Sequence, residues 1–183
     1  MNCWGAWKGL VRKETDAMEG ITQYYPKEED GAPKAEGATV YAYVYAKKGE
    51  LPKLYLETGF YTEEIGITKV KLLCQLPGED IVCEIPVGHG DSKRTSRDEG
   101  TFVYVNRSLD SATRSSLQRV MEKNYQTDVR FYYGYGSSKN FDAALTGEQK
   151  KDICMMLVYH YLLADENDEA FASLVAEFAP DSN

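Results

Sequence analysis

Alternating apolar and polar positions predict strands in the first half of the chain. Residues 39–46 read TVYAYVYA, a strict two-residue period that indicates a strand with two different faces. One face carries three tyrosines, which are Tyr41, Tyr43 and Tyr45. After a turn at 47–52, residues 53–60 are predicted to return as the neighbouring strand. The pattern therefore predicts an antiparallel hairpin with one tyrosine-rich face.

A second hairpin is predicted from residues 69–76 and 81–87, which flank the turn sequence PGED at 77–80. A four-residue loop sets Leu76 opposite Ile81. The pairing then continues along one apolar face: Cys74 with Cys83, Leu72 with Ile85, and Val70 with Val87. A shift of one residue would bring charged side chains onto this face, so the pattern selects the register. One hypothesis is that the two thiols meet across the strands; the alternative is a pair of reduced core thiols.

Helical spacing dominates the second half of the chain. A cap at Ser108 or Asp110 predicts a helix to about residue 124. Thr146 and Gln149 form a capping box, and the helix that they open is apolar nearly all round. We therefore expect a central buried helix near 148–164. Two further apolar stripes fit helical faces: Trp4, Trp7, Leu10 and Val11 at the start of the chain, and Phe171, Leu174, Val175 and Phe178 near its end.

Together these elements predict an α+β protein. The expected architecture is a mostly antiparallel sheet of about five to six strands, including short strands at 101–105 and 128–135, with two or three helices packed on one face. A length of 183 residues fits a single domain over 1–183. Two segments rich in glycine and charge, 26–38 and 88–100, are predicted as exposed loops.

Charge and cysteine usage narrow the functional classes. The formal net charge of −8 disfavours direct binding to nucleic acid or to an anionic membrane, and it fits a partner with a basic surface. No apolar run reaches the roughly 20 residues of a membrane span. The first ten residues lack the pattern of a secretory signal. The four cysteines form no C-x-x-C pair and the chain has only two histidines, so we expect no metal site. We also expect no cofactor. Because a secretory signal is missing, we predict a cytoplasmic protein with reduced thiols.

The segment 88–97 is a candidate ligand or partner site. His89 is a candidate general base, with Asp91 near enough in sequence to orient it. Alternatively, glycine amides together with Lys93, Arg94 and Arg97 are suited to hold an anion such as phosphate or an acidic protein patch. The segment does not match the phosphate-binding loop, however. A solvated loop without a function is the competing interpretation.

A second glycine-rich segment follows the strand predicted at 128–135. Residues 133–139 read YGYGSSK, which lacks the third glycine of a dinucleotide fingerprint. We interpret it as a strand end and turn. Its tyrosines, Tyr133 and Tyr135, are candidate binding residues together with Tyr41, Tyr43 and Tyr45. A stacking platform for bases would also need surrounding positive charge, which the mixed local charge does not provide. A protein-contact surface is the remaining interpretation for this set.

No motif identifies a reaction. Cys154 falls in an apolar helix, and His160 has no second metal ligand at helical spacing. The acidic pairs fall in turns and at helix starts, where carboxylates are favoured by solvation. We therefore expect a non-catalytic protein that binds another protein. One concrete form is an acidic inhibitor or modulator of a nucleic-acid-handling partner, of the anti-defence type carried by phages and mobile elements. The alternative is a binder or enzyme for an anionic, nucleotide-like ligand that acts through residues 88–97.

Overall fold

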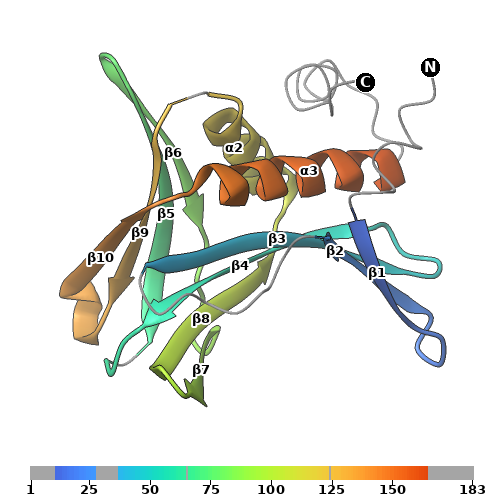
Figure 1. Cartoon of the computed structure of the whole chain (residues 1–183), viewed down its shortest axis with the longest axis horizontal. Coiled ribbons are helices and arrows are strands. Elements are labelled where there is room, and N and C mark those ends of the chain that lie inside the picture. The colour runs from blue at the N-terminus through green and yellow to red at the C-terminus, as the bar shows by residue number, and fades with distance from the viewer. Residues whose placement is uncertain (1–10, 28–36, 65, 124, 165–183) are drawn as a thin grey trace.

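Ten antiparallel strands in two sheets form most of the described fold. The computed structural model describes residues 11–27, 37–64, 66–123 and 125–164 (Figure 1). The first sheet has the strand order β1-β2-β3-β4-β8-β7, and the second has the order β10-β9-β5-β6. Every pairing between neighbours is antiparallel. The predicted class, α+β with mostly antiparallel strands, is therefore confirmed at that level.

The bounds of the elements follow the two sheets and the helices. The six-stranded sheet contains β1 (Val11–Asp16), β2 (Ile21–Pro26), β3 (Ala38–Lys47), β4 (Lys53–Tyr61), β8 (Gly100–Ser108) and β7 (Ser92–Arg97). The four-stranded sheet contains β10 (Lys139–Ala144), β9 (Thr127–Tyr133), β5 (Ile67–Leu76) and β6 (Glu79–Ile85). The helices are α2 (Ser111–Met121), the short 3-10 helix η1 (Tyr135–Ser137) and α3 (Gly147–Ala164).

The prediction of one sheet with about five to six strands is wrong. Three of the additional strands, β1, β7 and β10, lie at sheet edges, and nearly all their side chains are exposed or half-buried. An edge strand with little buried surface needs no alternating apolar residues, so hydrophobic periodicity does not reveal it. Val11 accordingly lies in β1 rather than on a helical face. Trp4, Trp7 and Leu10 lie outside the described residues, as does the helix predicted around Phe171–Phe178.

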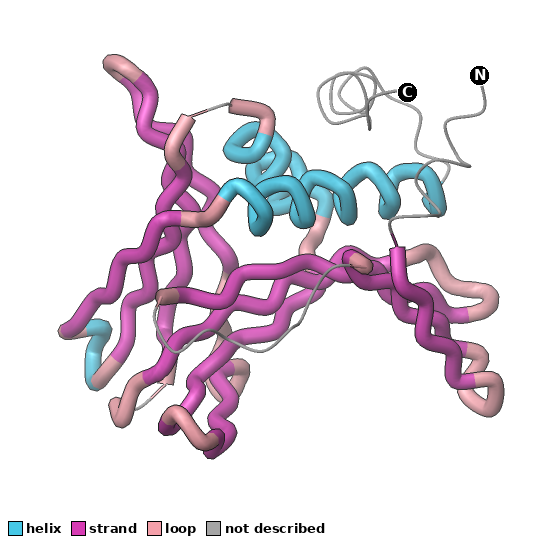
Figure 2. Tube along the Cα trace, viewed as in Figure 1, coloured by secondary structure: helices cyan, strands magenta, loops and turns pink. Residues whose placement is uncertain are grey.

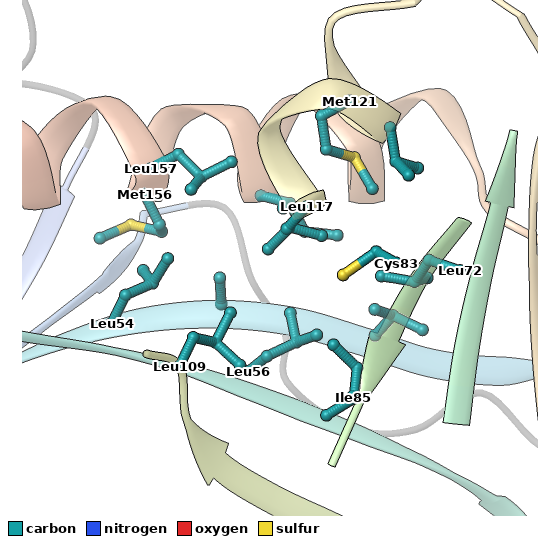
Figure 3. Packing of buried hydrophobic residues seen from close by; sticks show 14 of the residues in the cluster. Leu54, Leu56, Leu72, Cys83, Ile85, Leu109, Leu117, Met121, Met156 and Leu157 are labelled. Carbon is teal, nitrogen blue, oxygen red and sulfur yellow. The ribbon is translucent and has the colours of Figure 1, made fainter. Parts of the chain in front are cut away.

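Both α-helices pack on the inner faces of the sheets, as Figure 2 shows. The longer helix α3 lies over β3, and α2 lies against β6. Residues 153–161 of α3 are all buried. The core between these layers is apolar, and Figure 3 shows Leu56 of β4, Leu72 of β5, Leu117 of α2 and Leu157 of α3 converging in it. These four leucine side chains are fully buried, so hydrophobic packing holds the two sheets and the helices together.

The β5–β6 hairpin keeps the predicted face but differs in register by two residues. Its turn has two residues rather than four, because Leu76 pairs with Glu79 and Cys74 with Ile81. Gly78 has a φ of +89°, a left-handed conformation that the Pro-Gly sequence favours in a tight turn. A shift of two residues preserves the alternation, so the apolar face remains on the core side. Cys83 consequently lies opposite Leu72, and the predicted pairing of Cys74 with Cys83 is wrong.

The segment 88–100, predicted as an exposed loop, contains a strand. Residues Ser92–Arg97 form β7, which pairs along its length with β8 and turns back at residues 98 and 99. The side chains of β7 are mostly exposed, as expected for an edge strand, but its backbone is ordered by the ladder of hydrogen bonds to β8. The composition of the segment follows from its edge position, where charged side chains are favoured.

Candidate recognition surface

The outer face of the six-stranded sheet carries eight aromatic side chains. The paired registers and the alternation of the strands place them on the face opposite the helices. We call this surface the aromatic face; its aromatic members are Tyr25, Tyr41, Tyr43, Tyr45, Tyr55, Tyr61, Phe102 and Tyr104. The helix α3 packs on the opposite side of this sheet, over β2, β3 and β4 (Figure 1). The three tyrosines predicted on one face of β3 therefore form part of a larger set.

Four side chains form a continuous stack across the strands. The rings of Tyr25 and Tyr43 are stacked with centroids 5.2 Å apart, and the rings of Tyr43 and Tyr55 with centroids 5.1 Å apart. The guanidinium of Arg12 lies over the Tyr25 ring, 5.1 Å from its centroid. This stack joins β1, β2, β3 and β4, and its spacing follows from the distance between neighbouring strands. Cross-strand aromatic pairs of this kind stabilise a sheet.

The central ring of the stack has no open face. Tyr43 has a ring on each side and is only 7% exposed. A base or a sugar ring stacks on an open aromatic face, and the central ring offers none. Geometry therefore adds to the charge argument against a base-stacking platform. Burial also raises the pKa of the Tyr43 hydroxyl, so this side chain is neutral at physiological pH.

A polar network lies beside the stack. The Tyr43 hydroxyl and the Asn106 side chain of β8 exchange hydrogen bonds, with Asn106 Nδ2 donating to the hydroxyl oxygen at 3.0 Å. The same Nδ2 group donates to Glu57 Oε2 at 3.1 Å. Burial raises the pKa of the Glu57 carboxyl, whereas a hydrogen bond with Tyr41 and the more distant charges of β7 act in the opposite direction. A carboxylate thus lies among aromatic side chains, held by an amide from the next strand.

A second aromatic group lies toward the edge strand β7. The rings of Phe102 and Tyr104 are stacked with centroids 5.6 Å apart, and the Arg97 guanidinium lies 4.9 Å from the Phe102 centroid. Tyr61 packs against Phe102 and donates a hydrogen bond to Glu99 at 3.3 Å. Arg97 and Lys93 therefore border the aromatic face, while Arg12 borders its opposite edge.

The outer face of the four-stranded sheet has a different composition. There a row of charges crosses all four strands, with Glu84 bound to Lys71 at 3.2 Å and Arg130 bound to Asp142 by two hydrogen bonds of 2.7 and 2.6 Å. Leu73, Val82 and Tyr132 are its larger apolar members. One molecule thus has two outer sheet faces, one with a charged row and one dominated by aromatic rings.

The predicted partnership of His89 with Asp91 is not formed. One Asp91 carboxylate oxygen accepts a hydrogen bond from the Gly88 backbone, and the other binds the Arg107 guanidinium at 2.9 Å. His89 is exposed in the turn that precedes β7. Asp91 therefore closes this turn and anchors it to β8. The geometry supports a structural role for Asp91 rather than the orientation of a general base.

The three predicted basic residues do not converge. Lys93 and Arg97 belong to the outward-facing positions of β7, opposite Tyr104 and Gly100 of β8. Arg94 occupies the intervening position and lies on the other face of the strand. Successive side chains of a strand point to opposite faces, so these charges are held apart. In a flexible loop they could lie close together. Lys93 and Arg97 instead join the border of the aromatic face.

The remaining predicted residues are dispersed. Tyr133 lies at the end of β9 and packs edge-on against Phe60, with centroids 5.1 Å apart, between the two sheets. Tyr135 begins η1, and its side chain lies outside what the structure describes. Tyr133 therefore does not join the predicted set on β3. His160 is buried in α3, with Nε2 lying 3.2 Å from Arg114 Nη1 and 3.1 Å from the Pro52 carbonyl oxygen.

Most of the aromatic face was not predicted. The missed members lie on β2, β4 and β8: Tyr25, Tyr55, Glu57, Tyr61, Phe102, Tyr104 and Asn106. The residues on β4 could have been found from the sequence. The predicted return strand at 53–60 alternates, and pairing it with the first strand of the hairpin places Tyr55 beside Tyr43. For β2 and β8 the pairing partners were not known, and register between distant strands cannot be obtained from periodicity alone.

The comparisons with known proteins give no family for this chain. No protein-family model, curated protein or solved structure matches it. Among the described residues, no group of three or more histidine, cysteine or acidic side chains is arranged to bind a metal ion. None of the helices in the described ranges has the length and apolar character needed to cross a membrane.

Proposed function

We propose that the protein is a non-catalytic binding protein that recognises another protein through the aromatic face. The observation that carries this proposal is the contrast between the two outer sheet faces. A sheet face turned to water is ordinarily polar, as the charged row from Glu84 to Asp142 illustrates. The aromatic face departs from that rule over four neighbouring strands, which is typical of a surface that is covered in a complex.

The residue types support a protein partner. Tyrosine combines a large contact area with a polar tip and is enriched at protein interfaces, where few rotatable bonds limit the loss of entropy. Here the rings are also preorganised, because Tyr43 is fixed by Tyr25, Tyr55 and Asn106. Preorganised side chains lose less freedom when a partner binds. A net charge of −8 fits a partner with a basic surface, such as an enzyme that handles nucleic acid.

A pair of matched variants tests this proposal. Tyr41 and Tyr45 are half-buried at the rim of the stack, so Tyr41→Thr/Tyr45→Thr removes contact area while retaining β-forming residues. Tyr132→Thr makes the same change on the outer face of the four-stranded sheet. Each variant is used as bait for affinity capture from a lysate of the source organism or of the organism that it targets. Partner proteins that bind the parent chain and Tyr132→Thr should not bind the double variant. Equal recovery by both variants would contradict the proposal.

A further inference from the structure

We propose that the aromatic face receives an arginine or lysine side chain of its partner at Glu57. This inference rests on the proposed function and specifies the chemistry that the face recognises. Its first support is position. Glu57 lies in a row between Tyr41 of β3 and Asn106 of β8, with Tyr55 and Gly59 as the next outward-facing residues on its own strand. The carboxylate is thus placed within the aromatic face rather than at its border.

The second support is the orientation of the carboxylate. Asn106 Nδ2 donates to Oε2 of Glu57 at 3.1 Å, and Asn106 is itself fixed by the Tyr43 hydroxyl. This chain of hydrogen bonds holds the carboxylate before a partner arrives. A charged hydrogen bond to a guanidinium or ammonium group is strongest when the acceptor is already oriented.

The third support is the charge balance around Glu57. Among the described residues, no lysine or arginine forms an ion pair with Glu57. Other carboxylates nearby have such partners: Glu14 of β1 pairs with Arg12, and Asp91, in the turn before β7, pairs with Arg107. Burial meanwhile disfavours the charged carboxylate and raises its pKa. A partly desolvated carboxylate gains more from a new counter-ion than an exposed one does. The surrounding aromatic rings are also favourable neighbours for a cation.

The ligand chemistry is tested with two short peptides at 0.15 M salt, about the physiological value. The probes are acetylated tetra-arginine amide and the corresponding tetra-glutamine peptide, titrated into the isotope-labelled full chain and followed by NMR. The expected result is that tetra-arginine shifts the signals of Glu57, Tyr41 and Asn106, whereas tetra-glutamine does not. Shifts confined to the acidic turns, or equal shifts with both peptides, would overturn the inference.

Two isosteric variants separate a specific site from general attraction to an acidic protein. Glu57→Gln preserves an oxygen that accepts from Asn106, whereas Glu84→Gln removes an equal charge from the opposite sheet. We expect Glu57→Gln to weaken tetra-arginine binding by about fivefold, the effect of losing one favourable charge pair, and Glu84→Gln to weaken it by less than about twofold. Equal weakening by the two variants would show that only net charge matters and would overturn the inference.

The same variants distinguish this inference from the proposed function on which it rests. If the tyrosine double variant loses its partners while Glu57→Gln retains them with unchanged affinity, the face binds protein but not through a cation at Glu57. If neither variant loses a partner, the proposed function itself has failed. If the tyrosine double variant and Glu57→Gln both lose their partners while Glu84→Gln keeps them, the result supports both the proposed function and the cation site at Glu57.

Discussion

The ring of Phe102 occupies the space that a side chain at Gly59 would need. A Cβ atom placed on Gly59 would lie 2.6 Å from Cζ of Phe102 and 2.6 Å from the carbonyl oxygen of Val103. Gly59 lies within β4, where glycine would otherwise weaken a strand. The aromatic ring of the neighbouring strand therefore covers the gap, and the two residues together shape the part of the aromatic face next to β7.

This relationship predicts the effect of a single methyl group. Gly59→Ala forces the Phe102 ring and the β8 backbone to move, and overpacking of this kind should lower the free energy of unfolding by about 1–3 kcal/mol. Gly147→Ala is the control, because nothing lies within 4 Å of a Cβ there. That variant should leave stability unchanged or raise it by up to about 1 kcal/mol, since alanine favours the helix. Urea denaturation measures both; equal stability of the two variants would contradict the packing described.

The outer sheet faces each carry a carboxyl with a shifted pKa, Glu57 and Asp142. The contributions of these two groups to stability should change with pH in opposite directions. Glu57 has a pKa raised above its ordinary 4.5 by burial, so its stabilising contribution is present at low pH and is lost as pH rises through the folded pKa. Relative to the parent chain, Glu57→Gln should therefore gain stability as pH rises from 4.5 through the folded pKa of Glu57. A constant difference across this range would contradict the burial of this carboxyl.

The stability contribution of Asp142 should change with pH in the opposite direction to that of Glu57. Its pKa is lowered by hydrogen bonds from Arg130, so its contribution is present above the ordinary pKa of 3.8 and is lost as pH falls through the folded value. Asp142→Asn should be less stable than the parent chain at neutral pH, and the difference should shrink on acidification. Urea denaturation at several pH values measures both variants. A deficit that persists at the lowest pH would assign the loss to packing rather than to the Arg130 pair.

The capping box at the start of α3 is also testable. Thr146 Oγ1 accepts from the Gln149 backbone at 3.1 Å, and Gln149 Oε1 accepts from the Thr146 backbone at 2.9 Å. Thr146→Ala should destabilise the fold by about 1 kcal/mol in thermal or urea unfolding. Thr146→Asn, which retains a capping oxygen, should recover most of that loss. Failure of the asparagine variant to recover stability would contradict the capping role.

The core thiols should be unreactive in the folded protein. Burial raises the pKa of Cys83 to about 12, and Cys74 and Cys154 are buried free thiols. Because the thiolate is the reactive form, iodoacetamide at pH 8 should modify Cys83 only as fast as the protein opens. Mass spectrometry of peptides from native and urea-unfolded samples measures the rates. Rapid modification of Cys83 in the native state would contradict the core packing of the β5–β6 hairpin.

The sequence predicted elements best where one stretch of chain carries its own signal. The capping box at Thr146 and the two-faced strand around Tyr43 need only local residues to be recognised. Strands made of polar residues, such as β7, have no such signal, because their place in the fold is set by hydrogen bonds to a partner strand. The hairpin register failed by two residues for a related reason, since both registers bury the same face and only the turn at Gly78 distinguishes them.

The candidate site was predicted only in part for the same physical reason. Tyr41, Tyr43 and Tyr45 share a strand, so their common face follows from alternation. Tyr25 and Asn106 reach the same surface through pairing between strands far apart in the sequence, which no local pattern encodes. Proximity in sequence was misleading at Asp91, which binds Arg107 rather than orienting His89.

Photo-crosslinking from a single position tests the central claim most directly. A benzoylphenylalanine placed at Tyr45 reports on the aromatic face, and the same residue placed at Tyr132 reports on the outer face of the other sheet. Both replace a half-buried tyrosine on a sheet surface, so the two sites are matched. The account predicts a crosslinked partner from position 45 and none from position 132. Crosslinking from position 132 alone, or equally from both, would contradict recognition through the aromatic face.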